Sequence, residues 1–162
     1  PDSHEICFVP DGNYAALVER RAPNVCKPGR IVDTAGHSVG YHTGIHRFTV
    51  GQRKGLGISS PIPLYVTNLD PSTNTVVVGS RKTLDQTTLT ASRVNWIAHT
   101  PELGANVAAQ IRHHHPAASA RIWANDNATL RLEFDSPQRA IAPGQAVVVY
   151  DGDVVLGGGW ID

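Results

Sequence analysis

Short runs of strand-forming residues, separated by turn signals and without a stretch of helical periodicity, fill the second half of the chain. Two of the separators, residues 125–127 and 151–153, consist of Asn, Asp and Gly, which favour tight turns. About six short strands at this spacing predict a small antiparallel barrel or sandwich. Closure into a barrel would also remove the edge strands that such a chain otherwise exposes. The predicted strands are residues 89–97, 106–112, 120–124, 128–134, 145–150 and 154–161.

The first half predicts a small α/β domain. An amphipathic helix is expected from an N-cap at Asp11 to about Arg21, and the following Pro23 stops it. Strands are expected at residues 29–33 and 37–42, of which the second returns after a tight turn at residues 34–36. Two more are expected at residues 64–69 and 75–79, which form a hairpin. We therefore expect a mainly β chain with two domains. Residues 1–82 form the small α/β domain, and residues 83–162 form the antiparallel β-barrel.

The chain contains 14 Lys and Arg residues and 14 Asp and Glu residues, so its net charge gives no general argument for nucleic-acid binding. The charge is nevertheless unevenly distributed. Between Asp33 and Asp85 the only acidic residue is Asp70, whereas five Lys and Arg residues and three His residues fall in that interval. An anion-binding surface in this part of the chain is therefore still possible.

The apolar runs are too short to span a bilayer, no signal peptide is recognisable, and we expect no contact with a membrane. Two cysteines are too few for a disulfide scaffold, which favours a reducing compartment such as the cytoplasm. The chain begins at Pro1 and contains no Met. We therefore expect it to be a segment of a longer protein.

Residues 48–58, Phe-Thr-Val-Gly-Gln-Arg-Lys-Gly-Leu-Gly-Ile, place two adjacent cations, Arg53 and Lys54, among three glycines. Glycines allow positive φ and a close approach of the backbone to a partner, and the cations can bind a phosphate. The spacing does not fit a P-loop, which requires four residues between its glycines and a Ser or Thr after the Lys. From the residues alone, a solvated turn and a phosphate-binding loop both stay open.

The two cysteines and a histidine run are the remaining candidates for chemistry. Cys7 stands in an apolar run and is either a small buried hydrophobe or a reactive thiol, while a redox pair with Cys26 is a third interpretation. Cys26 itself is interpreted as incidental. In a strand, His113 and His115 would share a face and could chelate, but no third ligand follows at a fixed spacing. A polar edge strand or loop is favoured, and no metal site is expected.

Four motifs together resemble one family. They are Ser3-x-x-Ile6-Cys7-Phe8, the string at residues 49–58, Pro143-Gly144-Gln145-Ala146, and residues 150–153 followed by Leu156-Gly157-Gly158-Gly159. In this order they are similar to the bacterial tRNA-specific 2-thiouridylases, sulfurtransferases that make 2-thiouridine at the wobble position of some tRNAs. The resemblance covers essentially the whole chain. It implies the C-terminal part of such an enzyme, with a central small domain and a barrel like the second domain of elongation factor Tu.

The resemblance also implies roles for individual residues. Cys7 corresponds to the cysteine that carries the incoming sulfur as a persulfide. Arg112 and His113 correspond to a two-residue tRNA contact, usually Arg-Tyr, and Gln145 corresponds to a single tRNA contact. His113 lacks the phenolic hydroxyl, but it can stack on a base or contact a phosphate.

The same resemblance implies an N-terminal ATP-pyrophosphatase domain, whose Ser-Gly-Gly-Val-Asp-Ser-type loop and first catalytic cysteine do not occur in these residues. ATP with Mg²⁺ is expected to bind there, and no cofactor is expected in this chain. The chain alone is expected to accept sulfur from a cysteine desulfurase or a sulfur-carrier protein, without catalysing ATP-dependent thiolation. Arg53 and Lys54 are expected near the tRNA or against the missing domain. The alternative is a non-catalytic RNA-binding barrel in which Cys7 is buried.

Overall fold

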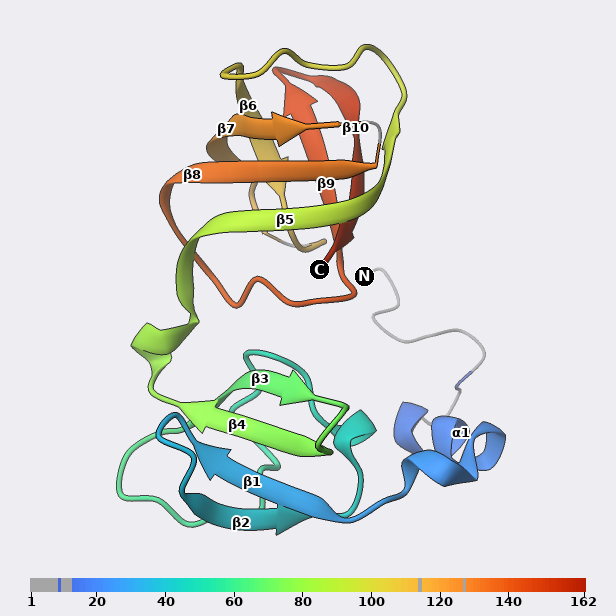
Figure 1. The fold of residues 1–162 in the computed structure, drawn as a ribbon, viewed down its shortest axis with the longest axis vertical. Helices are drawn as coiled ribbons and strands as arrows, with labels where there is room; N and C mark the ends of the chain where they lie inside the picture. Colours follow the sequence, from blue (N-terminus) through green and yellow to red (C-terminus); the bar gives the residue numbers. More distant parts are fainter. Residues whose placement is uncertain (1–8, 10–12, 114, 127) are drawn as a thin grey trace. The chain divides into compact units, whose positions relative to one another are not determined.

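The computed structural model describes residue 9 and residues 13–113, 115–126 and 128–162 of the chain. The chain divides into two compact units, Pro1–Arg81 and Lys82–Asp162 (Figure 1). Strands dominate both units, which confirms the prediction of a mainly β fold. Within the described part of the chain, no helix is both long and apolar enough to cross a membrane.

The first unit begins with the short helix α1, Tyr14–Arg21. The Asn13 side chain caps this helix by accepting a hydrogen bond from the amide of Ala16 at 3.0 Å. The expected N-cap at Asp11 is wrong, because an equally good capping residue stands immediately before the first helical residue. Asp11 itself lies outside the described residues. Two short 3-10 helices follow, η1 (Pro23–Val25) and η2 (Ile45–Arg47).

Four strands build a small mixed sheet in the first unit, in the order β2-β1-β4-β3. As predicted, β1 pairs antiparallel with β2, and β3 pairs antiparallel with β4. The two antiparallel pairs join through a parallel pairing of β1 with β4, which the local sequence pattern did not indicate. The centre of the core consists of fully buried Ile31, Val66, Val76 and Val78. The strand bounds are β1 Gly29–Asp33, β2 Ser38–His42, β3 Tyr65–Asp70 and β4 Thr75–Gly79.

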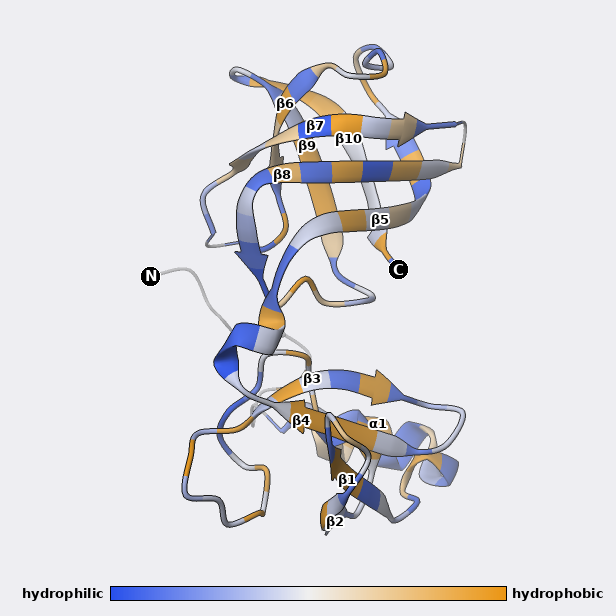
Figure 2. Ribbon diagram, turned by 60° about the vertical axis from the view of Figure 1, so that its left-hand side comes forward, coloured by the Kyte–Doolittle hydropathy of each residue, from blue (hydrophilic) through white to orange (hydrophobic). Residues whose placement is uncertain are grey.

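The second unit is a closed antiparallel barrel with the strand order β10-β5-β8-β7-β6-β9, which confirms the predicted architecture. Buried and exposed residues alternate along β8, as the alternating colours of that strand show (Figure 2). Strands β5 and β8 are longer than predicted because polar residues such as Asp85 and Arg139 continue the backbone pairing beyond the apolar runs. After η3 (Arg81–Leu84), the strands are β5 Asp85–Trp96, β6 Asn106–Gln110, β7 Ala118–Asn125, β8 Thr129–Arg139, β9 Ala146–Asp151 and β10 Val154–Ile161.

Strands β9 and β10 approach each other so closely that one position requires glycine. A Cβ atom on Gly158 would lie 2.2 Å from the carbonyl oxygen of Val147 on β9. The backbone fixes the positions of both the Cβ atom and the carbonyl oxygen, so no side-chain rotation could relieve the contact. The triglycine segment of β10 therefore has a packing role in closing the barrel.

Candidate functional site

Three of the predicted tRNA-contacting residues lie at the same end of the β6–β9 strand pair. These strands are antiparallel, with Gln110 opposite Val148. Arg112 and His113 follow the last residue of β6, and Gln145 precedes the first residue of β9. The prediction that one strand continues to residue 112 and that the other begins at residue 145 is therefore wrong. Turns at the barrel end, where the backbone leaves the ladder, carry these side chains.

The barrel holds Arg112 through the connection between β8 and β9. Arg112 is half-buried, and its Nη2 donates a hydrogen bond to the carbonyl oxygen of Ala140 at 2.8 Å. Ala140 is itself buried, and its amide donates to the carbonyl of Leu84 at 2.9 Å. A guanidinium has five N–H donors in a planar fork, so one internal bond leaves donors that can meet a phosphate.

The Gln110 side chain holds the turn that carries His113. Its Nε2 donates to the carbonyl oxygens of His113 and His115 at 3.1 and 2.7 Å. On the other side, the Tyr150 hydroxyl donates to Gln110 Oε1 at 3.1 Å. The turn closes with a hydrogen bond from the His115 amide to the Arg112 carbonyl. His113 is exposed, and this part of the histidine run lies in a turn, as the favoured interpretation of the sequence expected.

Sequence reasoning missed Gln110 and Tyr150 as positioning residues. A polar residue near the end of a strand is common and carries no signal of its own. Only the pairing of β6 with β9 brings the Tyr150 hydroxyl to the Gln110 amide.

Gln145 has a fixed backbone and a side chain that remains available to a ligand. Its amide donates to the carbonyl of Ala142 at 3.2 Å, and its carbonyl accepts from the amide of Ile161 at 2.8 Å. Gln145 is half-buried, and its side-chain amide makes no hydrogen bond with a described residue. It can therefore both donate to and accept from a base edge.

The loop at residues 51–57 belongs to the first unit and is organised by Gln52. The Gln52 side chain accepts from the amide of Thr49 at 2.9 Å and donates to the carbonyl of Lys54 at 3.0 Å. Gly51 and Gly55 have φ values of 91° and 73°, which side-chain-bearing residues rarely adopt. Arg53 and Lys54 are exposed, and neither forms an ion pair with a described residue. The loop thus presents two adjacent cations to solvent.

A groove of about 490 Å³ lies beside this loop within the first unit. It is lined in part by aromatic rings, an imidazole, a cation and an amide: Tyr14, Tyr41, Phe48, His42, Arg47 and Gln52. Aromatic faces next to a guanidinium can hold a planar group that carries an anion, as a nucleotide does.

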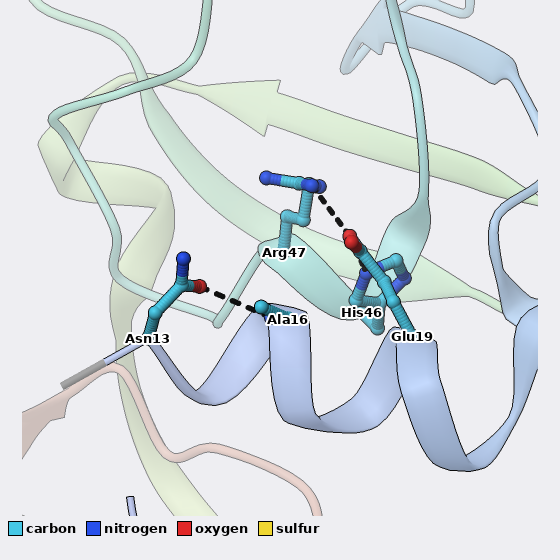
Figure 3. A network of polar contacts seen from close by, with 5 residues as sticks. All are labelled: Asn13, Ala16, Glu19, His46 and Arg47. Carbon is cyan, nitrogen blue, oxygen red and sulfur yellow. Dashed lines mark hydrogen bonds and ion pairs between the residues drawn. The ribbon is translucent and has the colours of Figure 1, made fainter. Parts of the chain in front are cut away.

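Cys7 lies outside the described residues. Cys26 is an exposed free thiol that follows η1. Near it, Glu19 on α1 accepts hydrogen bonds from His46 Nε2 at 3.0 Å and from Arg47 Nη2 (Figure 3). The hydrogen bond from His46, together with the charge of Arg47, holds the pKa of the Glu19 carboxyl below its ordinary value. Sequence reasoning did not connect these residues, because 27 positions separate Glu19 from His46.

Two family models match the chain, one in each unit. The tRNA methyl transferase PRC-barrel domain matches residues 17–80, and the Aminomethyltransferase beta-barrel domain matches residues 86–161. The tRNA-specific 2-thiouridylase MnmA of Magnetococcus marinus is 49% identical over 162 residues, covering 99% of this chain and 45% of that protein. The chain belongs to the tRNA-specific 2-thiouridylase family.

Other 2-thiouridylases match to a similar extent. The protein named tRNA-specific 2-thiouridylase MnmA of Paramagnetospirillum magneticum is 48% identical over 160 residues, covering 99% of this chain and 43% of that protein. Its namesake in Koribacter versatilis is 49% identical over 168 residues, covering 99% and 45% respectively. The chain therefore spans less than half the length of the curated relatives it matches.

Proposed function

We propose that this chain is the sulfur-accepting and tRNA-binding part of a sulfurtransferase that replaces the 2-oxygen of the wobble uridine in tRNA with sulfur. The observation that carries this proposal is the similarity, over nearly the whole chain, to proteins named tRNA-specific 2-thiouridylase. The barrel supports it, because Arg112 is held at the strand end where the resemblance expects a tRNA contact.

Cys7 is the proposed sulfur carrier. Its thiolate attacks the terminal sulfur of a donor persulfide, the donor leaves as a thiolate, and Cys7 becomes a persulfide. This exchange needs no external oxidant or reductant. Transfer to uridine also requires that the 2-oxygen be converted into a good leaving group by adenylation. That step belongs to the ATP-pyrophosphatase domain, where ATP with Mg²⁺ binds and where a further cysteine helps to release the sulfur.

The barrel end supplies the proposed tRNA contacts. Arg112 bonds a phosphate through the donors that Ala140 leaves available, and His113 stacks on an exposed base or contacts a phosphate. Gln145 bonds a base edge or sugar through its available amide. In the first unit, Arg53 and Lys54 add two exposed cations, which face either the RNA or the missing domain.

Persulfide mapping tests the sulfur-accepting role. The chain is incubated with a cysteine desulfurase and cysteine, alkylated, digested and analysed by mass spectrometry. Persulfide should appear on Cys7, and Cys26 is the internal control. Persulfide on Cys26 alone would contradict the assignment.

A non-catalytic RNA-binding barrel is the alternative function. The network around Arg112 and Gln110 involves no cysteine, so it supports RNA binding without sulfur transfer. This alternative predicts that Cys7→Ser changes neither tRNA binding by the chain nor thiolation by a longer protein that contains it.

A further inference from the structure

Three side chains with metal-binding atoms meet in the first unit, and none has a role in the function proposed above. Glu19 lies on α1, Cys26 follows η1, and His46 lies in η2. One ligand atom from each of them lies within 4.8 Å of the other two. Imidazole, thiolate and carboxylate are the ligands by which proteins bind Zn²⁺.

The His46 imidazole is fixed, but its hydrogen bonding is incomplete. The side chain is only 10% exposed, and its Nε2 lies 3.0 Å from Glu19 Oε1. Its Nδ1 is buried and has no hydrogen-bond partner among the described residues. The nitrogen that faces Glu19, and so the one that this cluster can offer to an ion, is Nε2.

Gly44 makes room for this ring. A Cβ atom on Gly44 would lie 2.6 Å from Nδ1 and 2.3 Å from Cε1 of His46. The same Cβ would lie 3.3 Å from the carbonyl oxygen of Val25, the residue before Cys26. A larger residue at position 44 would therefore displace the imidazole or separate the segments that carry the cluster.

Charge balance also suits a divalent cation. His46 and Arg47 both donate to Oε1 of Glu19, whereas Oε2 accepts no hydrogen bond from a described residue. Ionised Glu19 and Cys26, together with a neutral imidazole, would offset the two charges of a zinc ion. Because the zinc ion and its ligands together would be neutral, the nearby positive charge of Arg47 would not be repelled by a net positive site.

We propose that Glu19, Cys26 and His46 bind a zinc ion, with a water molecule in the fourth position; this inference does not depend on the proposed sulfur transfer. Bonds of about 2.0–2.3 Å place neighbouring ligand atoms roughly 3.3–3.8 Å apart in a tetrahedral site. Cys26 is exposed and Glu19 is partly exposed, so both can rotate to close on the fixed imidazole. The expectation of no metal site considered the histidine run alone and did not include this cluster.

Titration of the reduced 162-residue chain with Co²⁺ tests the site. Cobalt occupies zinc sites, and a cobalt–thiolate bond gives an intense charge-transfer absorption in the near ultraviolet. One equivalent of Co²⁺ should produce this band, and added Zn²⁺ should remove it. Cys26→Ser should abolish the band, and Glu19→Gln should weaken Co²⁺ binding by roughly tenfold or more.

Two control variants remove the competing ligands. Cys7→Ser removes the other thiol, and the double substitution His113→Asn, His115→Asn removes the exposed imidazole pair in the barrel. Both variants should keep the band. Cys26 is exposed, so Cys26→Ser should melt at the wild-type temperature in the absence of metal. A band that survives Cys26→Ser or requires Cys7, or no band at one equivalent of Co²⁺, would overturn the proposal.

Discussion

Replacing Arg112 with Ala removes the charge on which the proposed tRNA contact of the barrel depends. In the structure, one nitrogen of the guanidinium bonds the Ala140 carbonyl at 2.8 Å. That bond orients the side chain and leaves further N–H donors for a ligand. We therefore expect Arg112→Ala to weaken tRNA binding through the loss of one phosphate contact.

The size of the effect follows from one charged hydrogen bond and one released counterion. Loss of a hydrogen bond to a charged group costs about 1.5–3 kcal/mol, or roughly 10- to 150-fold in affinity. Neutralising one phosphate contributes about 0.9 to the slope of log K against log salt concentration. Raising the salt from about 50 to about 200 mM should therefore shrink the difference between wild type and variant by about 3.5-fold.

Fluorescence anisotropy with labelled tRNA at several salt concentrations measures both quantities. Arg112→Lys is the matched variant, because it keeps the charge and should keep the slope while losing the planar donor fork. Arg121→Ala removes an exposed cation from β7 and should leave affinity and slope close to those of the wild type. A slope for Arg112→Ala equal to that of the wild type would refute the phosphate contact.

Three further substitutions test other parts of the account. Gln110→Ala removes the amide that bonds two carbonyls of the neighbouring turn, so tRNA affinity, measured by anisotropy, should fall about tenfold with an unchanged salt slope; unchanged affinity would contradict its positioning role. Gly158→Ala places a Cβ against the Val147 carbonyl and should destabilise the chain by about 1–3 kcal/mol in urea denaturation; an unchanged midpoint would show that the strands can separate there. Hydrogen bonds from Ser72 and then Thr73 lower the pKa of Asp70 to about 2, so Ser72→Ala should raise it towards about 4 in a carboxyl NMR titration. A lowered pKa stabilises the fold above the ordinary Asp pKa, and this benefit is lost as the pH falls towards 2. In the variant the benefit should therefore be smaller, and its loss should be complete at a higher pH.

The sequence was sufficient to predict elements whose cause is local. Alternating apolar residues and Asn, Asp and Gly turns predicted each barrel strand and the hairpin of β3 with β4, because side-chain period and turn chemistry are encoded in neighbouring residues. The parallel pairing of β1 with β4 was not predictable in this way. It joins segments about forty residues apart, and its cause is the burial of Ile31 and Val76 in a shared core.

Some features of the candidate site could likewise be predicted from sequence motifs, and others depend on the folded chain. Family motifs identified Arg112, His113 and Gln145, and the barrel topology brings them to one end of the β6–β9 pair. The role of the Gln110 amide in holding the turn depends on which strands are neighbours, so no local sequence pattern predicts it. The cluster of Glu19, Cys26 and His46 likewise combines three segments whose proximity is a property of the folded unit.

In the proposed function, Cys7 carries sulfur while the barrel binds tRNA. The most direct test is to measure 2-thiouridine in tRNA after reaction with ATP, a sulfur donor and a longer protein that contains this chain, with and without Cys7→Ser. If Cys7 carries the sulfur, Cys7→Ser eliminates 2-thiouridine while tRNA affinity stays at the wild-type value. Undiminished 2-thiouridine formation by the Cys7→Ser protein would contradict it.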